Sequence, residues 1–549
     1  MIEKSKNIII TGFSFTGKSV VGKEVARRLG WKFIDSDEEI VALAGKSIPD
    51  IFAQDGEKHF RKLESQVLEK VCKGKEAVIS TGGGAVVDWR NRELFSDNGV
   101  VICLEARPQT IYKRLDAAQE TSTVVRPLLA VDDPPGQIKQ LKAARQPYYA
   151  TADRSVCTEN LSIDKVADEV IHGFRQVGHR NSVASYHEST PFVVTTPTQG
   201  YPVFVGWGIL GDLGRRMRQL GLSDCASIIS DENVFLRHGS PVSTSLEQAD
   251  FKAASFSVLP GETTKTFHTA MKLYDWLVER QTERVHAIVA LGGGMVGDLA
   301  GFVAATFLRG LPLVQVPTSL IAMADAAIGG KVAVNHPMAK NLIGAFYQPS
   351  LVIADVSTLT TLPERELVSG WAEVIKHGFI LDGELVDFLQ AHISELSSLE
   401  AALSIEAIQR SAMLKATVVG EDEKEQERRM ILNYGHTIAH GLEAATGYER
   451  FLHGEAVAIG MMGAAMLSER LGLISHDIVA RQAQLLEGFG LPTYCSDVDR
   501  NEVVQAMALD KKVRERAIKW VLLEGIGQTT IRDDVPQEYV AGVLNELLT

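Results

Sequence analysis

The chain has 549 residues, of which 45% are hydrophobic and 23% charged, and its formal net charge is −13. This length exceeds what one hydrophobic core supports and predicts at least two domains, with three or four favoured. The acidic balance argues against a nucleic-acid-binding protein but allows local basic pockets for anionic metabolites. The sequence shows no apolar run of membrane-spanning length, no signal peptide, and five cysteines without Cys-x-x-Cys spacing. We therefore expect a cytoplasmic protein.

A phosphate-binding loop follows the first predicted strand. Residues 7–11 form an apolar run typical of a buried strand, which leads into GFSFTGKS at 12–19 and then a predicted helix at 20–29. In this context backbone N–H groups and the positive helix end would hold phosphates, Lys18 would neutralise the transferring group, and Ser19 would bind magnesium. The structural alternative is a glycine turn without a ligand.

Polar motifs farther along this part of the chain indicate a small acceptor. Asp35 and Asp37 end the next predicted strand, and the alternation of side chains places both on one side of it. Four further motifs are GExxFRxxE at 56–64, TGGG at 81–84, RPLL at 126–129 and RxxY at 145–148. With the phosphate loop, they make residues 1 to about 172 resemble shikimate kinase.

The resemblance implies an α/β P-loop domain with a parallel sheet that transfers phosphate from ATP to the 3-hydroxyl of shikimate. Asp35 would act near the magnesium or as base, and Arg126 would belong to a mobile lid. The ATP contacts would be Gly12, Thr16, Gly17, Lys18, Ser19, Val20 and Arg126, and the shikimate contacts would be Asp37, Arg61, Gly83, Gly84 and Arg145. Phe15 departs from the family, which usually has glycine there. The alternatives are a kinase of other specificity and a regulatory nucleotide-binding module.

A linker and a second α/β domain are predicted next. Residues 173–190 are polar and lack periodicity, which predicts a linker. Short apolar runs alternate with helical segments from residue 191 onward, as in an α/β sheet domain. A predicted strand at 285–291 ends in GGGMVGD, but VPTSL at 316–320 stands where a ribose-binding acid is expected. This arrangement argues against a standard dinucleotide-binding fold.

Three histidines near the middle of the last third suggest a metal site. His436 and His440 are four residues apart and share one face of a predicted helix, and His453 follows across a turn. Glu373, three residues before Lys376 in another predicted helix, would supply the anionic ligand. A catalytic divalent site needs about three N or O ligands and an open position. The alternative is that the histidines cap and fill a helical core.

The metal motif belongs to a longer series of motifs in this half. The others are DxN at 231–233, PGExxK at 260–265, the glycines at 292–294, PTS at 317–319, IGGK at 328–331 and KN at 340–341. In this order they make residues 191 to 549 resemble 3-dehydroquinate synthase. The resemblance implies an NAD-binding α/β domain at 191–357, a helical zinc and substrate domain at 358–549, and a homodimer.

The resemblance assigns roles residue by residue. Zinc or cobalt would bind Glu373, His436 and His453, and catalysis would involve His440, Lys376 and Glu425. The NAD contacts would be Asp231, Asn233, Glu262, Lys265, Gly293, Gly294, Asp298, Thr318, Ser319 and Lys340. The substrate contacts would be Asp325, Lys331, Lys340, Asn341, Lys376, Lys415, Arg429, Asn433, His440, His453 and Lys512, with Arg309 reaching a neighbouring subunit. Ser369 stands where a substrate-contacting asparagine is common.

The implied reaction is the cyclisation of 3-deoxy-arabino-heptulosonate 7-phosphate to 3-dehydroquinate and phosphate. Oxidation of a ring alcohol by NAD would make the adjacent C–H acidic enough for phosphate to leave, and the hydride would then return. The alternatives are another sugar-phosphate cyclase and a metal-dependent polyol dehydrogenase. Only the dehydrogenase would consume NAD stoichiometrically.

Overall fold

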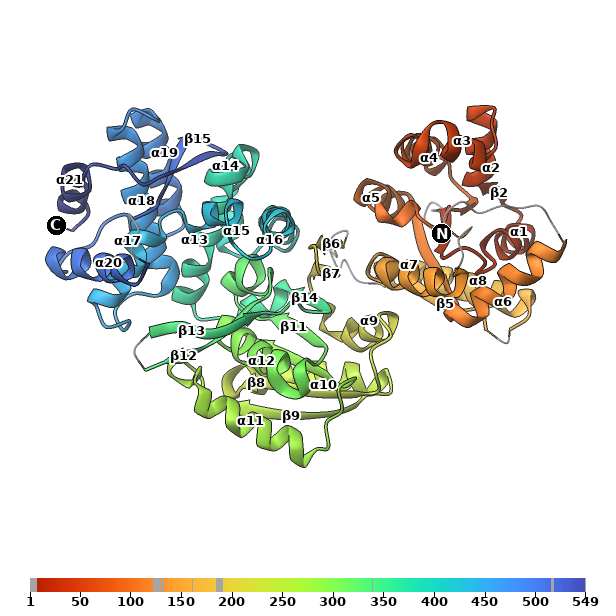
Figure 1. The fold of residues 1–549 in the computed structure, drawn as a ribbon, viewed down its shortest axis with the longest axis horizontal. Coiled ribbons are helices and arrows are strands. Elements are labelled where there is room, and N and C mark those ends of the chain that lie inside the picture. The colour runs from red at the N-terminus through yellow and green to blue at the C-terminus, as the bar shows by residue number, and fades with distance from the viewer. Residues whose placement is uncertain are drawn as a thin grey trace. The chain divides into compact units, whose positions relative to one another are not determined.

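The computed structural model describes residues 7–121, 129, 133–159, 161–183, 191–337, 339–514 and 518–548 (Figure 1). The chain divides near residue 190 into two compact units, here called unit 1 and unit 2.

Unit 1 is a parallel five-stranded sheet with the strand order β2-β3-β1-β4-β5. Ile9 belongs to one apolar cluster, whereas its neighbours Ile8 and Ile10 belong to another, so the central strand is buried on both faces. The strands are β1 (Asn7–Gly12), β2 (Lys32–Asp35), β3 (Ala77–Ser80), β4 (Gly99–Glu105) and β5 (Arg154–Cys157). The predicted parallel-sheet domain is confirmed.

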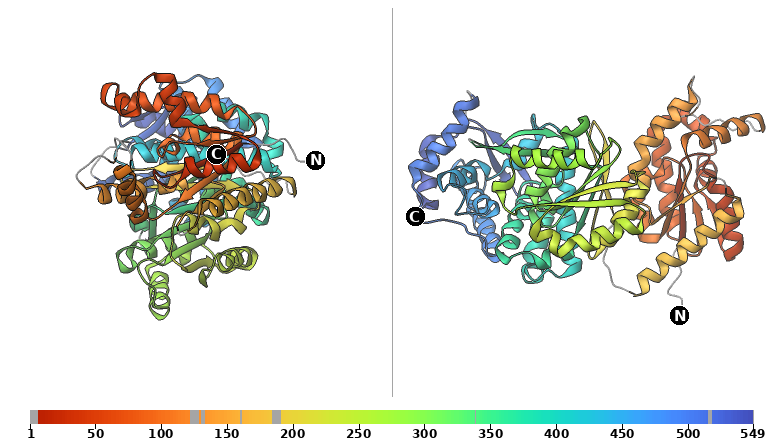
Figure 2. Two further views of the ribbon diagram at one scale, coloured as in Figure 1. Left: turned by 90° about the vertical axis from the view of Figure 1, so that its right-hand side faces the viewer. Right: turned by 90° about the horizontal axis from the view of Figure 1, so that it is seen from below.

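Helices on both sides of the strands complete unit 1 (Figure 2). They are α1 (Lys18–Leu29), α2 (Ser36–Ala44), α3 (Ile48–Gln54), α4 (Gly56–Cys72), α5 (Trp89–Asn98), α6 (Pro108–Thr121), α7 (Pro134–Tyr149) and α8 (Ile163–Val183), with a short 3₁₀ turn, η1, at Ala85–Val87.

Helix α8 extends into the segment 173–190 that was predicted to be a linker. Residues 173–183 continue helix α8, and only 184–190 of the predicted linker lie outside the described residues. The helix continues through Gly173. The missing side chain at this position makes room for Arg154, because a Cβ there would lie 2.6 Å from Cδ of that arginine. The ring of Phe174 packs edge-on against that of Trp31, with 5.4 Å between the ring centroids, so this polar stretch makes an apolar contact with the rest of unit 1.

The first part of unit 2 is a seven-stranded sheet with the order β6-β7-β14-β11-β10-β8-β9. Its strands are β6 (Phe192–Thr195), β7 (Gly200–Gly206), β8 (Cys225–Asp231), β9 (Lys252–Val258), β10 (Ala287–Gly292), β11 (Leu313–Pro317) and β14 (Leu351–Asp355). From β8 the chain goes to β9 on one side and then to β10 on the other. Such a change of direction leaves a crevice at the carboxyl ends of the strands, where α/β proteins bind ligands.

Helices and a hairpin surround this sheet. The helices are α9 (Leu213–Gln219), α10 (Glu232–Gln248), α11 (Phe267–Glu279) and α12 (Gly294–Thr306), and the antiparallel hairpin pairs β12 (Lys331–His336) with β13 (Ala339–Phe346). Short helical turns are η3 (Ile209–Asp212), η4 (Glu262–Thr264), η5 (Phe307–Arg309), η6 (Ala322–Ala326), η7 (Val356–Thr361) and η8 (Arg428–Asn433). The sheet ends at Asp355, close to the predicted domain division after residue 357.

The second part of unit 2 is helical, as predicted, with one added hairpin, β15 (Trp520–Gly525) and β16 (Gln528–Arg532). Its helices are α13 (Glu364–Leu381), α14 (Gly383–Ala391), α15 (Ile393–Ser397), α16 (Ala401–Glu421), α17 (His436–Ala445), α18 (His453–Arg470), α19 (His476–Gly488), α20 (Arg500–Arg514) and α21 (Gln537–Leu547). Among the described residues, every helix is too short or too polar to cross a membrane.

Candidate functional site

The loop after β1 folds around its own lysine. Lys18 donates from Nζ to the carbonyl oxygens of Gly12 and Phe13, both at 2.9 Å, and Thr16 donates to the Phe13 carbonyl at 2.8 Å. Gly12 has φ +133°, and a Cβ there would lie 2.4 Å from the Leu104 carbonyl oxygen. The loop therefore has the compact form that brings a lysine and the start of α1 to one point.

Phe15 occupies a backbone conformation that favours glycine. Its φ is +63°, its ring packs against the apolar cluster that contains Phe13, and its carbonyl accepts a hydrogen bond from Arg114 at 3.2 Å. Packing of the ring offsets the steric cost of this conformation, which is about 1–2 kcal/mol for an L-residue.

We expect Phe15→Ala to destabilise unit 1 more than Phe15→Gly, by about 1 kcal/mol, because alanine loses the ring but keeps the left-handed strain. Denaturant unfolding of the two variants and the parent chain measures this difference. Equal unfolding free energies for alanine and glycine would show that the strain is absent.

A hydroxyl and a carboxylate meet beside the loop. Ser19 donates from Oγ to Asp35 at 2.6 Å, and the other oxygen of Asp35 accepts from the backbone N–H of Asp37 at 3.0 Å, which caps α2. Hydroxyl and carboxylate oxygens are the ligands that magnesium prefers, so this pair can hold the ion next to Lys18.

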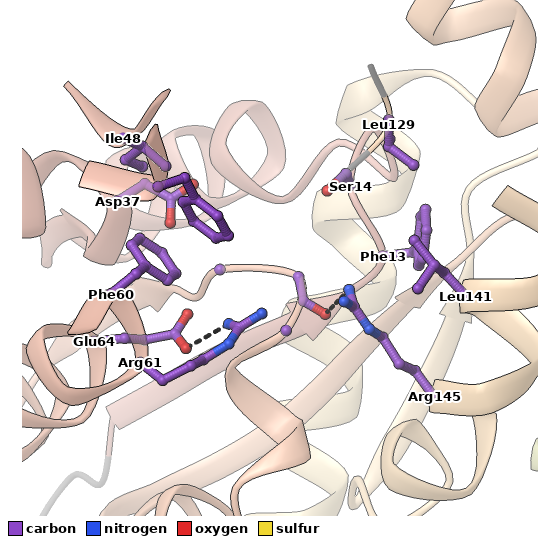
Figure 3. Close-up of a pocket in the computed structure, with 14 residues that line it drawn as sticks. Phe13, Ser14, Asp37, Ile48, Phe60, Arg61, Glu64, Leu129, Leu141 and Arg145 are labelled. Atoms are coloured by element: carbon purple, nitrogen blue, oxygen red, sulfur yellow. Dashed lines mark hydrogen bonds and ion pairs between the residues drawn. The ribbon is translucent and has the colours of Figure 1, made fainter. Parts of the chain in front are cut away.

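A pocket of about 540 Å³, open to solvent, lies beside the loop (Figure 3). Figure 3 shows Asp37 and Arg61 on one side and Arg145 facing them from the other. Arg61 binds Glu64 at 2.7 Å, and Arg145 donates to the Gly83 carbonyl at 3.2 Å. The pocket is lined by Phe13, Ser14, Asp37, Ile48, Phe52, Phe60, Arg61, Glu64, Gly82, Gly83, Gly84, Leu129, Leu141 and Arg145. Two guanidinium groups, together with the Asp37 carboxylate and a Glu64 carboxylate that pairs with Arg61, suit a small hydroxylated carboxylic acid.

Glu64 is the residue of this pocket whose role sequence reasoning missed. Its side chain is almost fully buried, and burial raises its pKa although Arg61 lowers it. Gly84 leaves room for the same arginine, because a Cβ there would lie 2.4 Å from Nη2 of Arg61. The sequence could have indicated this ion pair, since Arg61 and Glu64 are three residues apart on one helix face.

In unit 2, Lys265 joins three of the predicted cofactor-binding segments. Its Nζ lies 2.9 Å from Glu262, 3.0 Å from Asp298 and 2.6 Å from the side-chain oxygen of Asn341. Burial raises the pKa of Asp298 to about 6, although Lys265 lowers it. The lysine thus connects η4, α12 and the β12–β13 hairpin at one edge of the crevice.

Several other predicted cofactor contacts lie at or just after the carboxyl ends of the strands. Asp231 ends β8 and caps α10 through the Val234 N–H at 3.0 Å. Gly293 precedes α12, and a Cβ there would meet Oγ of Ser319 at 3.3 Å, so these two segments approach closely. Thr318 donates its N–H to the Gly292 carbonyl at 3.0 Å. The glycine loop and the PTS segment therefore form one wall of the crevice.

A metal-binding geometry is formed by Glu373, His436 and His453. One oxygen of Glu373 lies 3.7 Å from Nε2 of each histidine. His436 places Nδ1 at 3.2 Å from the Tyr434 carbonyl, which can only accept, so Nδ1 carries the proton and Nε2 has a free lone pair. Zinc bonds of about 2.0–2.1 Å require ligand atoms separated by roughly this distance. The predicted ligand set fits zinc.

His453 is oriented by a residue that sequence reasoning did not assign. Its Nδ1 lies 3.3 Å from Glu443 on α17, which directs Nε2 toward Glu373. A carboxylate of this kind fixes the tautomer of a metal-binding histidine. His440, predicted on the same helix face as His436, is exposed beside the triad, with ring centroids 5.5 Å and 6.4 Å from those of His436 and His453.

Cationic side chains surround the triad. Lys376 pairs with Glu373, and Lys415 binds Asp325 at 2.8 Å. Burial lowers the pKa of Lys415 to about 8, while the Asp325 carboxylate raises it.

Glu425 binds Lys331 at 2.5 Å and accepts from Asn433 at 3.2 Å. Arg429 is almost fully buried and donates to the carbonyl oxygens of Gly329 and Glu423. The cluster is suited to an anionic substrate.

Three protein-family models match the chain: "3-dehydroquinate synthase C-terminal" at residues 370–513, "3-dehydroquinate synthase N-terminal" at 255–369 and "Shikimate kinase" at 15–175. The 3-dehydroquinate synthase of Nostoc punctiforme is 46% identical over 354 residues, which are 64% of this chain and 98% of that protein. The chain belongs to the 3-dehydroquinate synthase family. Its unit 1 is a shikimate kinase, so the chain is an enzyme with both activities.

Two solved structures resemble the synthase unit. ValA, a 2-epi-5-epi-valiolone synthase from Streptomyces hygroscopicus with NAD+ and Zn2+ bound, is 27% identical with a TM-score of 0.59, and the match covers 63% of this chain and 96% of that one. A 2-deoxy-scyllo-inosose synthase complexed with carbaglucose-6-phosphate, NAD+ and Co2+ is 26% identical with a TM-score of 0.60, and the match covers 65% and 100%. Related cyclases therefore bind NAD+ and Zn2+ or Co2+.

Some predicted residues of the two enzymes lie apart from these contacts. In the synthase, Lys340 places Nζ 4.0 Å from the centre of the Tyr448 ring, and Arg309 is exposed with φ +65°. Lys512 belongs to α20, but its side chain lies outside the described part of the structure. In the kinase, Arg126 also lies outside the described residues, and Val20 is exposed on α1.

Proposed function

We propose that the synthase unit uses NAD and zinc to convert 3-deoxy-arabino-heptulosonate 7-phosphate to 3-dehydroquinate and phosphate. We also propose that the kinase unit phosphorylates the 3-hydroxyl of shikimate with ATP and magnesium. The observation that carries the first proposal is the meeting of Glu373, His436 and His453 among buried lysines. The second rests on the pocket between Asp37, Arg61 and Arg145 beside the phosphate loop.

In the synthase, bound NAD would accept and return a hydride, and bound zinc would polarise an alcohol oxygen of the substrate. Lys265 holds Glu262 and Asp298 at the crevice, where they can fix the cofactor's polar groups. Lys376 and Lys415 supply positive charge for the substrate's anionic groups. His440 is exposed next to the triad and can exchange a proton with the substrate phosphate.

In the kinase, residues from two strand ends would position the reactants. Lys18 would stabilise the charge that develops on the transferring phosphoryl group, and Ser19 with Asp35 would hold magnesium. Arg61 and Arg145 would bind the carboxylate of shikimate, and Asp37 would accept hydrogen bonds from its hydroxyl groups. Asp35 lies two residues from Asp37, so the metal and the acceptor would be held by one short segment.

We expect the synthase to form one molecule of 3-dehydroquinate and one of phosphate per substrate molecule with NAD present only in catalytic amounts. The reason is that one cofactor molecule both removes and returns the hydride. Product analysis with simultaneous recording of absorbance at the NADH wavelength measures this. Accumulation of NADH in proportion to product would instead indicate a polyol dehydrogenase, and a different carbocycle would indicate another sugar-phosphate cyclase.

A homodimer is proposed for the synthase unit. Arg309 is exposed at the end of η5, and Tyr347, which follows β13, donates its hydroxyl to the Leu311 carbonyl at 2.7 Å. This contact brings the end of β13, where Phe346 is exposed, close to Arg309. We expect light scattering to give twice the mass of one chain at micromolar concentration. A fully active chain with the mass of one copy would contradict the proposal.

A further inference from the structure

Helix α13 carries a stripe of three residues that faces the start of α18. Arg365, Ser369 and Glu373 are spaced four residues apart, so they lie one above another on one face of the helix. Glu373 is the proposed metal ligand at the end of this stripe. The first two residues contact the segment that carries His453, the ligand opposite Glu373.

Arg365 forms the outer contact. Its Nε and Nη2 each donate to a different oxygen of Glu455 at 2.7 Å, and Nη2 also donates to the Arg450 carbonyl at 2.8 Å. Glu455 in turn accepts from the backbone N–H of Leu452 at 2.9 Å, which fixes the first turn of α18. One guanidinium therefore holds both the loop before His453 and the carboxylate that caps its helix.

Ser369 forms the inner contact. Its hydroxyl accepts the backbone N–H of Gly454, the residue after His453, at 3.1 Å in a buried position. The approach is very close, because a Cβ at position 454 would lie 1.8 Å from the Ser369 carbonyl oxygen. The space between the two helices therefore requires glycine at 454 and is filled by the small Ser369 side chain.

We propose that Arg365 and Ser369 are positioning residues that hold His453 at metal-binding distance from Glu373. This inference rests on the proposed metal site. It also gives Ser369, which stands where the family commonly has a substrate-contacting asparagine, a role in this chain. Neither residue needs to touch substrate, because each acts on the backbone next to His453.

The test is zinc affinity of the full chain, measured by competition with a chromophoric chelator. We expect Arg365→Ala and Ser369→Ala each to raise the zinc Kd about 10-fold or more, within the range found for residues that support metal ligands. Arg365→Lys should keep part of the affinity, because it retains the charge but loses the two-pronged contact. The chelator-treated Arg365 variants should unfold at nearly the denaturant concentration of the chelator-treated parent, since an exposed ion pair contributes little stability.

A matched control is Arg481→Ala, which removes a partly exposed arginine that pairs with Asp387 and with Gln390 at 3.0 Å. It should leave the zinc Kd unchanged. Unchanged zinc affinity in both Arg365→Ala and Ser369→Ala would overturn the inference. If Ser369→Ala folds poorly, Arg365→Ala and Arg365→Lys decide the question. A parent chain that binds no zinc would instead refute the proposed metal site. This result differs from unchanged affinity in the variants, which would refute only the positioning role of Arg365 and Ser369.

Discussion

His436→Ala should remove bound zinc and lower synthase turnover by more than about 100-fold, which is beyond the loss expected from a supporting residue. Nε2 of His436 faces Glu373 at 3.7 Å, and the Tyr434 carbonyl fixes the tautomer that leaves this nitrogen free. Alanine leaves two of the three ligands. Zinc content after gel filtration and turnover with added zinc measure both effects.

A histidine in a similar local setting provides the control. His476 begins α19, as His436 begins α17, and its Nδ1 binds Glu469 at 3.0 Å on the exposed surface. His476→Ala should retain zinc and turnover. The ligand assignment fails if His436→Ala keeps its zinc and its activity.

Lys18→Ala should lower phosphoryl transfer by at least about 100-fold while leaving synthase turnover unchanged. The ammonium group lies at the centre of the phosphate loop, within 2.9 Å of two of its carbonyl oxygens. Its charge would stabilise the transition state, so the loss should appear in kcat at saturating ATP. Coupled detection of ADP with shikimate as acceptor measures the rate.

Lys23→Ala controls for the loss of a lysine from the same helix. Lys23 is exposed on α1 and lies 3.9 Å from Glu38. Its removal should change the kinase rate less than twofold. A Lys18→Ala rate within a few-fold of the parent would contradict the role given to Lys18.

Local patterns in the sequence predicted the elements that carry chemistry. The apolar run before GFSFTGKS predicted β1, and the spacing of His436 and His440 predicted their common helix. These predictions need only neighbouring residues, because strand and helix periodicity are local properties. The assembly of Glu373 with His436 and His453 joins segments more than 60 residues apart. The residue pattern suggested Glu373 beside three histidines, and the resemblance to a family selected these three ligands.

The sequence could not show features that depend on packing between distant segments. Glu443 resembles any helical glutamate until the fold brings it to His453. Gly173 is the first residue of the predicted linker, but it lies inside α8 and packs closely against Arg154. The left-handed backbone conformation of Phe15 could not be predicted, because phenylalanine is not a residue type that indicates this conformation. In the first two cases the deciding partner lies on another helix or strand, which periodicity within one element does not identify.

Both proposed histidine ligands are the first residues of their helices, His436 of α17 and His453 of α18, whereas Glu373 lies in the middle of α13. Helix ends fray more readily than helix centres. A metal bound to all three would act as a cross-link that joins the first turns of two helices to the middle of a third. Its escape and the opening of those first turns would then be the same motion, so amide exchange at the starts of α17 and α18 would report on the lifetime of the bound ion.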